Sequence, residues 1–200
     1  MNLPHYFAEI IQSHLTSARA ECWKWDSVPD FGSLVVIEQK DLRIIACVTS
    51  IETGSADPSR QPYAYQKTEV ELLREQPQIF SFLKTYIQLT PVGFFTEKEP
   101  AIQYFLPPQP AKIHAFVRSV DTTLAQQFFT QTSFLYLLQH ANPISYDEVL
   151  FALINRFYAS GCLSTTTIQL LVDHYTMIAG SDYRRVRFFC ERLSIMLGSD

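Results

Sequence analysis

The sequence predicts an α+β protein, in which an N-terminal six-stranded β-barrel carries a helical insertion and a C-terminal α-helical bundle follows. Two observations define the halves: β-branched runs separated by turn residues in the first, and apolar residues at helical spacing in the second. A third is the stiff proline-rich segment Pro107 to Pro110, which separates them. We expect the barrel domain over residues 1–110, with the insertion near 66–88, and the helical domain over 111–200.

The strands of the expected barrel are short and are separated by polar or glycine-containing turns. The clearest signal is a hairpin of two β-branched runs, in which at least one strand is buried on both faces. Pro91 should lie at a sheet edge or at a strand start, because proline has no amide hydrogen to donate. The six expected strands span residues 6–12, 18–23, 34–37, 43–48, 90–95 and 102–106.

The helical insertion follows an expected exposed loop over residues 54–62, which is rich in glycine, serine and proline. Thr68 and Glu71 have the spacing of a capping box, so we expect a helix to begin there. A second short turn or helix is expected over residues 79–83, after the interruption by Pro77.

The second half reads as three or four amphipathic helices after a short extended piece over residues 113–120. Asp121 should cap a helix over residues 124–140, and Ser145 with Glu148 has a second capping-box pattern. Ser164 or Thr165 should start the next helix, and a last helix should include Val186 to Leu197.

Composition excludes several classes of protein. The 200 residues are 47% hydrophobic, which is enough to build a core, and the net charge of −4 provides no general attraction to nucleic acid or anionic lipid. No apolar run reaches the roughly 18–20 residues of a membrane helix, and no signal peptide is recognisable at the N-terminus. We therefore expect a cytoplasmic protein without a membrane partner, whose four separated cysteines are buried and reduced.

No motif for catalysis or for a cofactor is recognisable. The six glycines form no phosphate-binding loop, and the five histidines have no i, i+4 spacing for a metal. The adjacent Asp173 and His174 fit an ordinary helix surface. We therefore expect no enzyme, no cofactor and no metal, and keep a small hydrolase with a dispersed site as a minor alternative.

Two groups of residues are candidate partner-binding surfaces. The first interleaves basic and aromatic side chains in the loop before the insertion. The second is an arginine cluster at the start of the last helix, beside Tyr183, which also includes Arg192. Either could bind a protein partner or phosphates, and either could instead be an ordinary solvated surface. The candidate residues are Arg60, Tyr63, Tyr65, Lys67, Arg184, Arg185 and Arg187.

The segments Phe31 to Ile37 and Ile44 to Ile51 resemble the HAS barrel, which occurs in HerA-type ATPases and at the N-terminus of the ATP synthase α and β subunits. Further similarity lies in Glu75 to Phe80, Val92 to Phe94 and Pro107 to His114, so the resemblance covers residues 5 to about 115. It implies a barrel that forms a crown on a ring-shaped ATPase and contacts partners. No Walker motif follows, so the motor activity and catalytic residues of the family do not transfer.

These observations favour a non-enzymatic interaction or assembly module, which either associates with its own copies or docks on a separate ATPase. The alternative is an accessory protein that binds nucleic acid weakly through a local arginine and tyrosine surface. Salt separates the two hypotheses, because phosphate binding weakens steeply with salt and a packed protein interface tolerates it.

Overall fold

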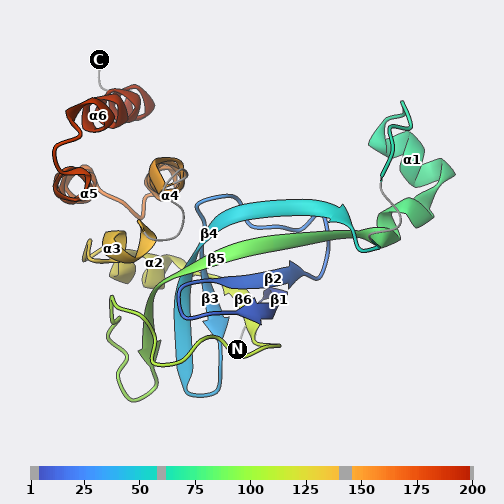
Figure 1. Cartoon of the computed structure of the whole chain (residues 1–200), viewed down its shortest axis with the longest axis horizontal. Coiled ribbons are helices and arrows are strands. Elements are labelled where there is room, and N and C mark those ends of the chain that lie inside the picture. Colours follow the sequence, from blue (N-terminus) through green and yellow to red (C-terminus); the bar gives the residue numbers. More distant parts are fainter. Residues whose placement is uncertain (1–4, 58–61, 140–145, 199–200) are drawn as a thin grey trace.

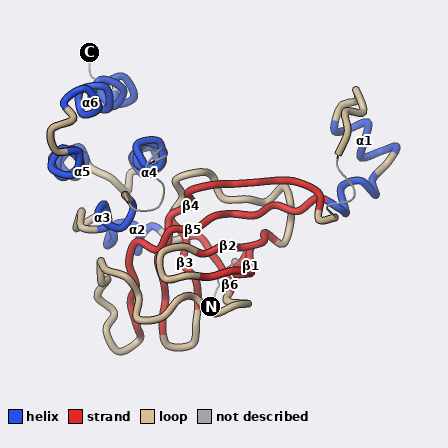
Figure 2. The backbone as a smooth tube through the Cα atoms, viewed as in Figure 1, coloured by secondary structure: helices blue, strands red, loops and turns tan. Residues whose placement is uncertain are grey.

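A closed antiparallel barrel and a group of helices lie side by side, and a long two-stranded ribbon projects from the barrel (Figure 1; Figure 2). The computed structural model describes residues 5–57, 62–139 and 146–198. Around the barrel the strands follow the order β1-β2-β5-β4-β3-β6. They are β1 (Tyr6–Ser13), β2 (Ala18–Cys22), β3 (Leu34–Glu38), β4 (Leu42–Ser55), β5 (Leu83–Thr96) and β6 (Phe116–Ser119). The fold class is therefore α+β with an N-terminal six-stranded barrel, as the sequence predicts.

The first three strands lie where the sequence predicts them, and the fourth begins there but continues to Ser55 instead of ending at Val48, whereas the sixth lies elsewhere. Residues 102–106 form no strand and contribute one isolated bridge, between Gln103 and Phe94. The barrel is instead closed by β6, which pairs with both β1 and β3. Since β6 lies beyond residue 110, the strands of the barrel continue past the boundary that the proline-rich segment indicates.

The fifth strand is much longer than expected and contains Pro91 in its interior. Of the two positions predicted for Pro91, the strand start is wrong, because β5 begins at Leu83, whereas the sheet edge agrees with the end of the β2 pairing at Leu89. The strand tolerates the proline for two reasons: its pairing with β2 ends at Leu89, and its pairing with β4 is irregular where Ala46 faces Pro91. Because proline has no amide hydrogen, it could not donate a regular hydrogen bond between strands, and none is required of it at this position.

The insertion between β4 and β5 is helical over a shorter range than the predicted 66–88. It contains α1 (Glu69–Glu75) and the 3₁₀ helix η1 (Pro77–Phe82), and residues 83–88 already belong to β5. The expected loop over 54–62 is shorter too, because Gly54 and Ser55 complete β4, while residues 58–61 lie outside the described part of the chain.

Two cores result from the alternation of side chains along β3 and β4. Val35, Ile37, Ile44 and Ala46 point into the barrel, where they meet small and aliphatic residues of the other strands. Their neighbours Leu34, Ile45 and Cys47 point to the other face and pack on the helices. Both faces of this hairpin are therefore buried, as the sequence predicts, and the barrel wall separates the two cores.

Helices cover the outer face of the hairpin and of β5. They are α2 (Thr122–Phe128), α3 (Phe134–Leu138), α4 (Tyr146–Ala159), α5 (Thr165–Ala179) and α6 (Tyr183–Leu197). The predicted caps Asp121 and Ser164 are confirmed, since each side chain accepts a hydrogen bond from a backbone N–H of the first turn. The expected helix over 124–140 is two helices, α2 and α3, and its end at His140 lies outside the described residues, as does Ser145.

A close approach fixes the helices to the barrel. Gly32 has a φ of +77°, and a Cβ atom built there would lie 2.7 Å from the Cβ of Ala152 on α4. Only glycine allows this backbone conformation at this distance without a shift. The loop before β3 therefore packs directly on α4.

Candidate partner-binding surfaces

The arm is the part of the molecule that leaves the barrel, and we define it as residues 49–85, which begin after the last β4 residue beside β3 and end before the β5 residues paired with β2. β4 and β5 pair along their full lengths of 14 residues each, whereas β2 and β3 have only 5 residues. The pairing of β3 with β4 therefore extends no further along β4 than Cys47, and β2 pairs with β5 only over Tyr86–Leu89. In the part of the chain that the structure describes, the rest of the ribbon has no further strand beside it, and it carries α1 and η1 at its end (Figure 1).

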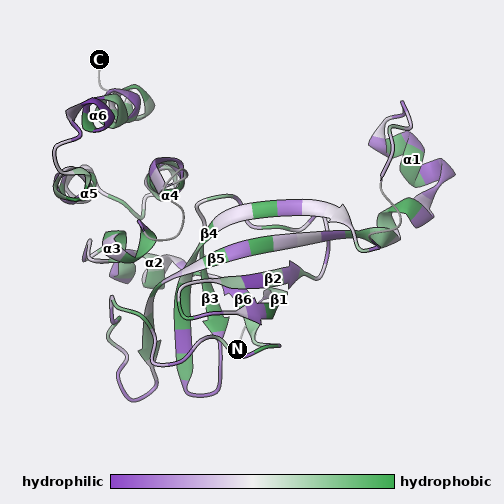
Figure 3. Ribbon diagram, viewed as in Figure 1, coloured by the Kyte–Doolittle hydropathy of each residue, from purple (hydrophilic) through white to green (hydrophobic). Residues whose placement is uncertain are grey.

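The tip of the arm, which we define as residues 62–82, leaves apolar side chains in contact with solvent. Neither α1 nor η1 has a buried residue. Val70 is 76% exposed and Leu73 is 47% exposed, and their i, i+3 spacing places them on one face of α1. Figure 3 shows this mixture of hydrophobic and hydrophilic residues at the tip, far from the barrel.

Local polar interactions, rather than a core, hold α1 together. Thr68 and Glu71 form the predicted capping box: the Glu71 carboxylate accepts from the Thr68 backbone N–H at 2.8 Å, and the Thr68 hydroxyl accepts from the Glu71 N–H at 3.3 Å. The Thr68 hydroxyl also donates to the Glu71 carboxylate, at 2.8 Å. The bond from the Thr68 backbone N–H, followed by this one from the hydroxyl, lowers the pKa of Glu71. A seven-residue helix is marginal by itself, so these caps help to explain how the tip keeps its form without burial.

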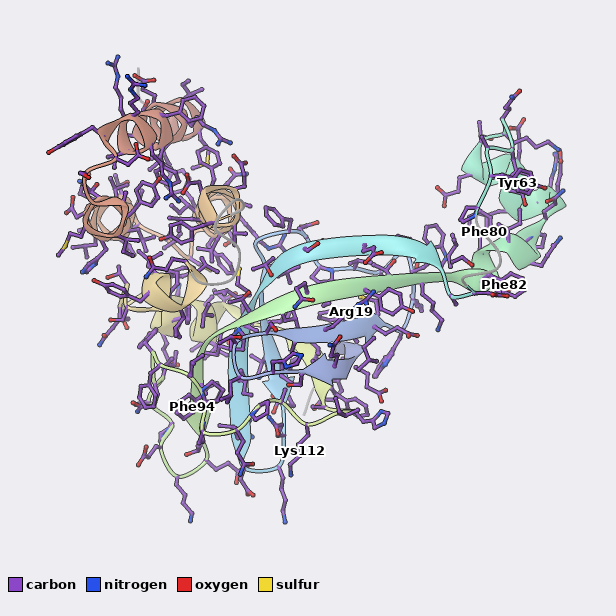
Figure 4. The ribbon with its side chains drawn as sticks, in the orientation of Figure 1. Arg19, Tyr63, Phe80, Phe82, Phe94 and Lys112 are labelled. Carbon is purple, nitrogen blue, oxygen red and sulfur yellow. The ribbon has the colours of Figure 1, made fainter. Side chains whose placement is uncertain are left out.

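The structure places the first predicted group of residues on this tip. The rings of Tyr63 and Tyr65 lie 4.2 Å apart between centroids, and Tyr63 is 69% exposed. Lys67 is paired with Glu75, and Arg60 lies outside the described residues. Figure 4 shows Tyr63 with Phe80 and Phe82 at the end of the arm. The aromatic side chains form a surface here, but the lysine charge is already balanced.

One ring contact ties the base of the tip to the barrel. Phe80 of η1 stacks on Trp25, which lies in the loop after β2, with 5.4 Å between ring centroids. The Trp25 carbonyl accepts a hydrogen bond of 2.8 Å from the hydroxyl of the buried Thr85 on β5. This loop therefore covers one face of the ribbon and orients the tip.

The second predicted group lies at the other end of the molecule, on α6 (Figure 1). Arg185 donates three hydrogen bonds of 2.6–3.2 Å to Asp147 on α4, and its pKa is raised by these bonds. Arg192 makes a similar pair with Glu148, again on α4. These arginines therefore join α6 to α4 and are not available to bind phosphate.

Arg187 and Arg184 face solvent. Arg187 is paired with Glu191 at 2.7 Å, one turn along the helix. Arg184 is exposed and has no ion pair within the described part of the chain. Of the three predicted arginines only Arg184 carries an unbalanced charge, so the structure does not bring them together as a phosphate-binding surface.

A groove that sequence reasoning missed lies between the barrel and the helices. It has a volume of about 1260 Å³, and Glu38, Arg43 and Arg118 line it. The Glu38 carboxylate accepts from Arg43 at 3.0 Å and from Arg118 at 2.8 Å. Glu38 and Arg43 face each other across the β3–β4 hairpin, so exact register was the signal that could have found them. Glu97 supplies the second negative charge, because it pairs with Arg43 at 3.3 Å. The two bonds of Glu38 link β3, β4 and β6.

The side chains that were considered for catalysis make hydrogen bonds within the fold or are buried in it. His174 is hydrogen-bonded to Thr132, and Asp173 accepts from Gln169, so the two neighbours do not act on each other. Burial raises the pKa of Cys22 to about 11 and raises that of Cys47 further, so both are protonated at neutral pH and are poor nucleophiles. Within residues 5–57, 62–139 and 146–198, no cluster of three or more metal-ligating side chains occurs.

No protein-family model matches the chain, and no curated protein matches it. The resemblance to the HAS barrel therefore stays a prediction from the sequence. Among the described helices, none combines the length and the apolar character that crossing a membrane requires.

Proposed function

We propose that this chain is a non-enzymatic assembly module of the cytoplasm, which makes protein–protein contacts through its arm. The observation that supports this most is the tip, where α1 and η1 are held out on a ribbon and bury no residue. Apolar surface that is covered by a partner contributes about 25 cal/mol per Å². Val70, Leu73 and Tyr63 would supply such surface, and no membrane partner is involved.

Two kinds of partner agree with this proposal. The first is another copy of the chain, and the second is a separate ATPase, which is the partner class that the HAS-barrel resemblance implies. An accessory role on nucleic acid has less support, because two of the three predicted arginines are occupied by Asp147 and Glu191. Binding that weakens steeply with salt would identify that alternative.

Light scattering of the purified protein at low and high salt tests the proposal. We expect a mass of at least twice the 23.0 kDa of one chain, in a whole-number ratio, and we expect this mass to survive high salt. The double variant Val70→Asp/Leu73→Asp should reduce this mass. Ile195→Asp is the matched control, because Ile195 is an exposed apolar side chain on α6, away from the arm, and its replacement should change nothing.

Two results would count against the proposal. If the double variant assembles like the wild type, the tip is not the contact surface. If the wild type stays a single chain at every salt concentration, self-assembly is wrong, and the remaining test is co-purification with an ATPase. That ATPase should be retained by the wild type and lost with Val70→Asp/Leu73→Asp; retention by both would overturn the proposal.

A further inference from the structure

The outer edge of β4 is a strand edge that the barrel leaves open. β3 pairs with β4 only as far as Cys47, and two bonds of the preceding loop, at Gly32 and Ser33, satisfy Val48. Within the described residues, no strand pairs with this side of β4 beyond Val48. Ser50 to Thr53 are four exposed residues in succession, whereas β5 opposite them alternates with buried ones.

The backbone groups that face outward can be assigned from their neighbours. Ala56 donates its N–H toward β5, to the Phe82 carbonyl, so by the alternation of an antiparallel ladder Gly54 and Glu52 also face β5. Ile51, Thr53 and Ser55 therefore direct their N–H and C=O groups away from β5. Within the described residues, these three present backbone donors and acceptors in one row without a partner on that side.

This edge lacks the usual protection. Exposed strand edges are commonly blocked by lysine, by proline or by a covering loop, because they otherwise accept a further strand. Residues 50–55 contain neither lysine nor proline. Their one charge, Glu52, is paired at 3.4 Å with Arg19 of β2, which lies on the other side of β5. The edge is therefore suited to strand addition.

We propose that the occupant of this edge is the same edge of a second copy, so that two arms form one continuous antiparallel sheet. This inference rests on the proposed assembly function and names its partner. A two-fold axis at Thr53 places Thr53 opposite Thr53 of the second copy, and Ile51 opposite Ser55 of the second copy. All three outward residues then pair, which gives about six backbone hydrogen bonds.

The charge on Glu52 favours this register over the one shifted by a single residue. With the axis at Thr53, Glu52 faces Gly54 of the second copy, which has no side chain. A shift of the axis to Glu52 would place two carboxylates opposite each other, which is unfavourable in a sheet. The Thr53 pair at the centre is a favourable cross-strand pair. The sequence of this edge is thus complementary to itself.

Ile51→Pro tests the backbone pairing, because it removes an outward N–H without removing a bond to β5. We expect light scattering to report twice the 23.0 kDa chain mass for the wild type and the single mass for Ile51→Pro. Ile51→Val keeps the N–H and the β-branched shape, so it should stay at the double mass. Circular dichroism should show the same fold for all three proteins, and an Ile51→Pro protein that keeps the double mass would overturn the inference.

Thr53→Cys tests the register without relying on the proline variant. Opposed residues of a hydrogen-bonded antiparallel pair have Cα atoms about 5.5 Å apart, which a disulfide can span. Mild oxidation should therefore convert Thr53→Cys into a covalent dimer, and Glu52→Cys should cross-link much less. Oxidised wild type is the background control, because its own four cysteines are free. Equal cross-linking of Thr53→Cys and Glu52→Cys would overturn the register.

The two proposals fail in different ways. If Ile51→Pro and Thr53→Cys behave as the wild type while Val70→Asp/Leu73→Asp lowers the mass, assembly through the tip stands and edge pairing is wrong. If the wild type is a single chain under all conditions, pairing with a second copy is wrong, and the assembly function then depends on co-purification with the ATPase alone.

Discussion

The two halves of β4 belong to different physical environments. In its first half, Ile44 to Val48 are all buried, because β3 and β5 flank the strand, the barrel interior lies on one face and the helices lie on the other. In its second half, Ser50 to Thr53 are all exposed, and among the described strands β5 alone pairs with them. The first half of this continuous strand is thus part of the core, and its second half is exposed to solvent. The strand is therefore longer than the core requires.

The largest expected effect comes from matched isoleucines on the two halves. Ile45→Ala should destabilise the protein by about 2–5 kcal/mol, because Ile45 is 0% exposed and packs on the helices. Ile51→Ala should cost less than about 1 kcal/mol, because Ile51 is 38% exposed. Urea unfolding of both variants at a protein concentration that keeps the chain monomeric measures the difference. Equal losses would contradict the division of β4 into two environments.

A smaller effect should separate two arginines of α6, which extends the comparison to the helices. Arg185→Ala should cost about 1–3 kcal/mol, because it removes a bidentate ion pair to Asp147 that joins two helices. Arg187→Ala should change stability by less than about 0.5 kcal/mol, since its pair with Glu191 lies on the surface of one helix. Thermal unfolding of the two variants checks this order, and a reversed order would show that the contact between α4 and α6 contributes little.

The smallest effect concerns pH at the tip. The Thr68 backbone N–H and hydroxyl lower the pKa of Glu71 below its ordinary value of 4.5. A carboxyl with a lowered pKa in the folded state stabilises the fold above its ordinary pKa, and this contribution is lost as the pH falls through the lowered value. We therefore expect α1 to unwind in acid while the barrel keeps its structure.

Amide hydrogen exchange or amide chemical shifts between neutral pH and pH 3 would measure this local change. Glu71→Gln is the control, because an amide oxygen can still accept from the Thr68 N–H and does not titrate. A tip whose amides respond to acid equally with and without the Glu71 carboxyl would show that another group is responsible.

Local signals in the sequence were sufficient for the features that depend on neighbouring residues. The β3–β4 hairpin and the caps at Thr68, Asp121 and Ser164 are confirmed, because each depends on residues within a few positions of one another. The same is true of the α+β class, which follows from the change of apolar period at the middle of the chain.

Features that depend on distant pairing could not be predicted. Phe116–Ser119 is a strand of four residues whose partners are β1 and β3, and its own pattern is too short to distinguish it from a loop. Residues 102–106 have the stronger β pattern, yet they form only the Gln103 bridge. The arm was missed for a related reason, because Pro91 suggested a strand start where neighbouring strands in fact allow a proline.

The candidate site shows the same limit. The tyrosines of the loop were recognised, but their position at the end of a ribbon follows from the pairing of β4 with β5. The arginine cluster was recognised as well, but Asp147 and Glu148 lie far from it in the sequence and neutralise two of its members. Charge balance on a surface is a property of the folded chain and cannot be read from one segment.

The closure of the barrel by β6 also has a consequence for biosynthesis. β1 is made first, but one of its two partner strands, β6, is made last, since Tyr6 pairs with Arg118. Until residue 119 has left the ribosome, the nascent chain holds an incomplete sheet with two open edges. Contacts between such distant residues form slowly, so this interval is when the chain is most exposed to chaperones and to aggregation.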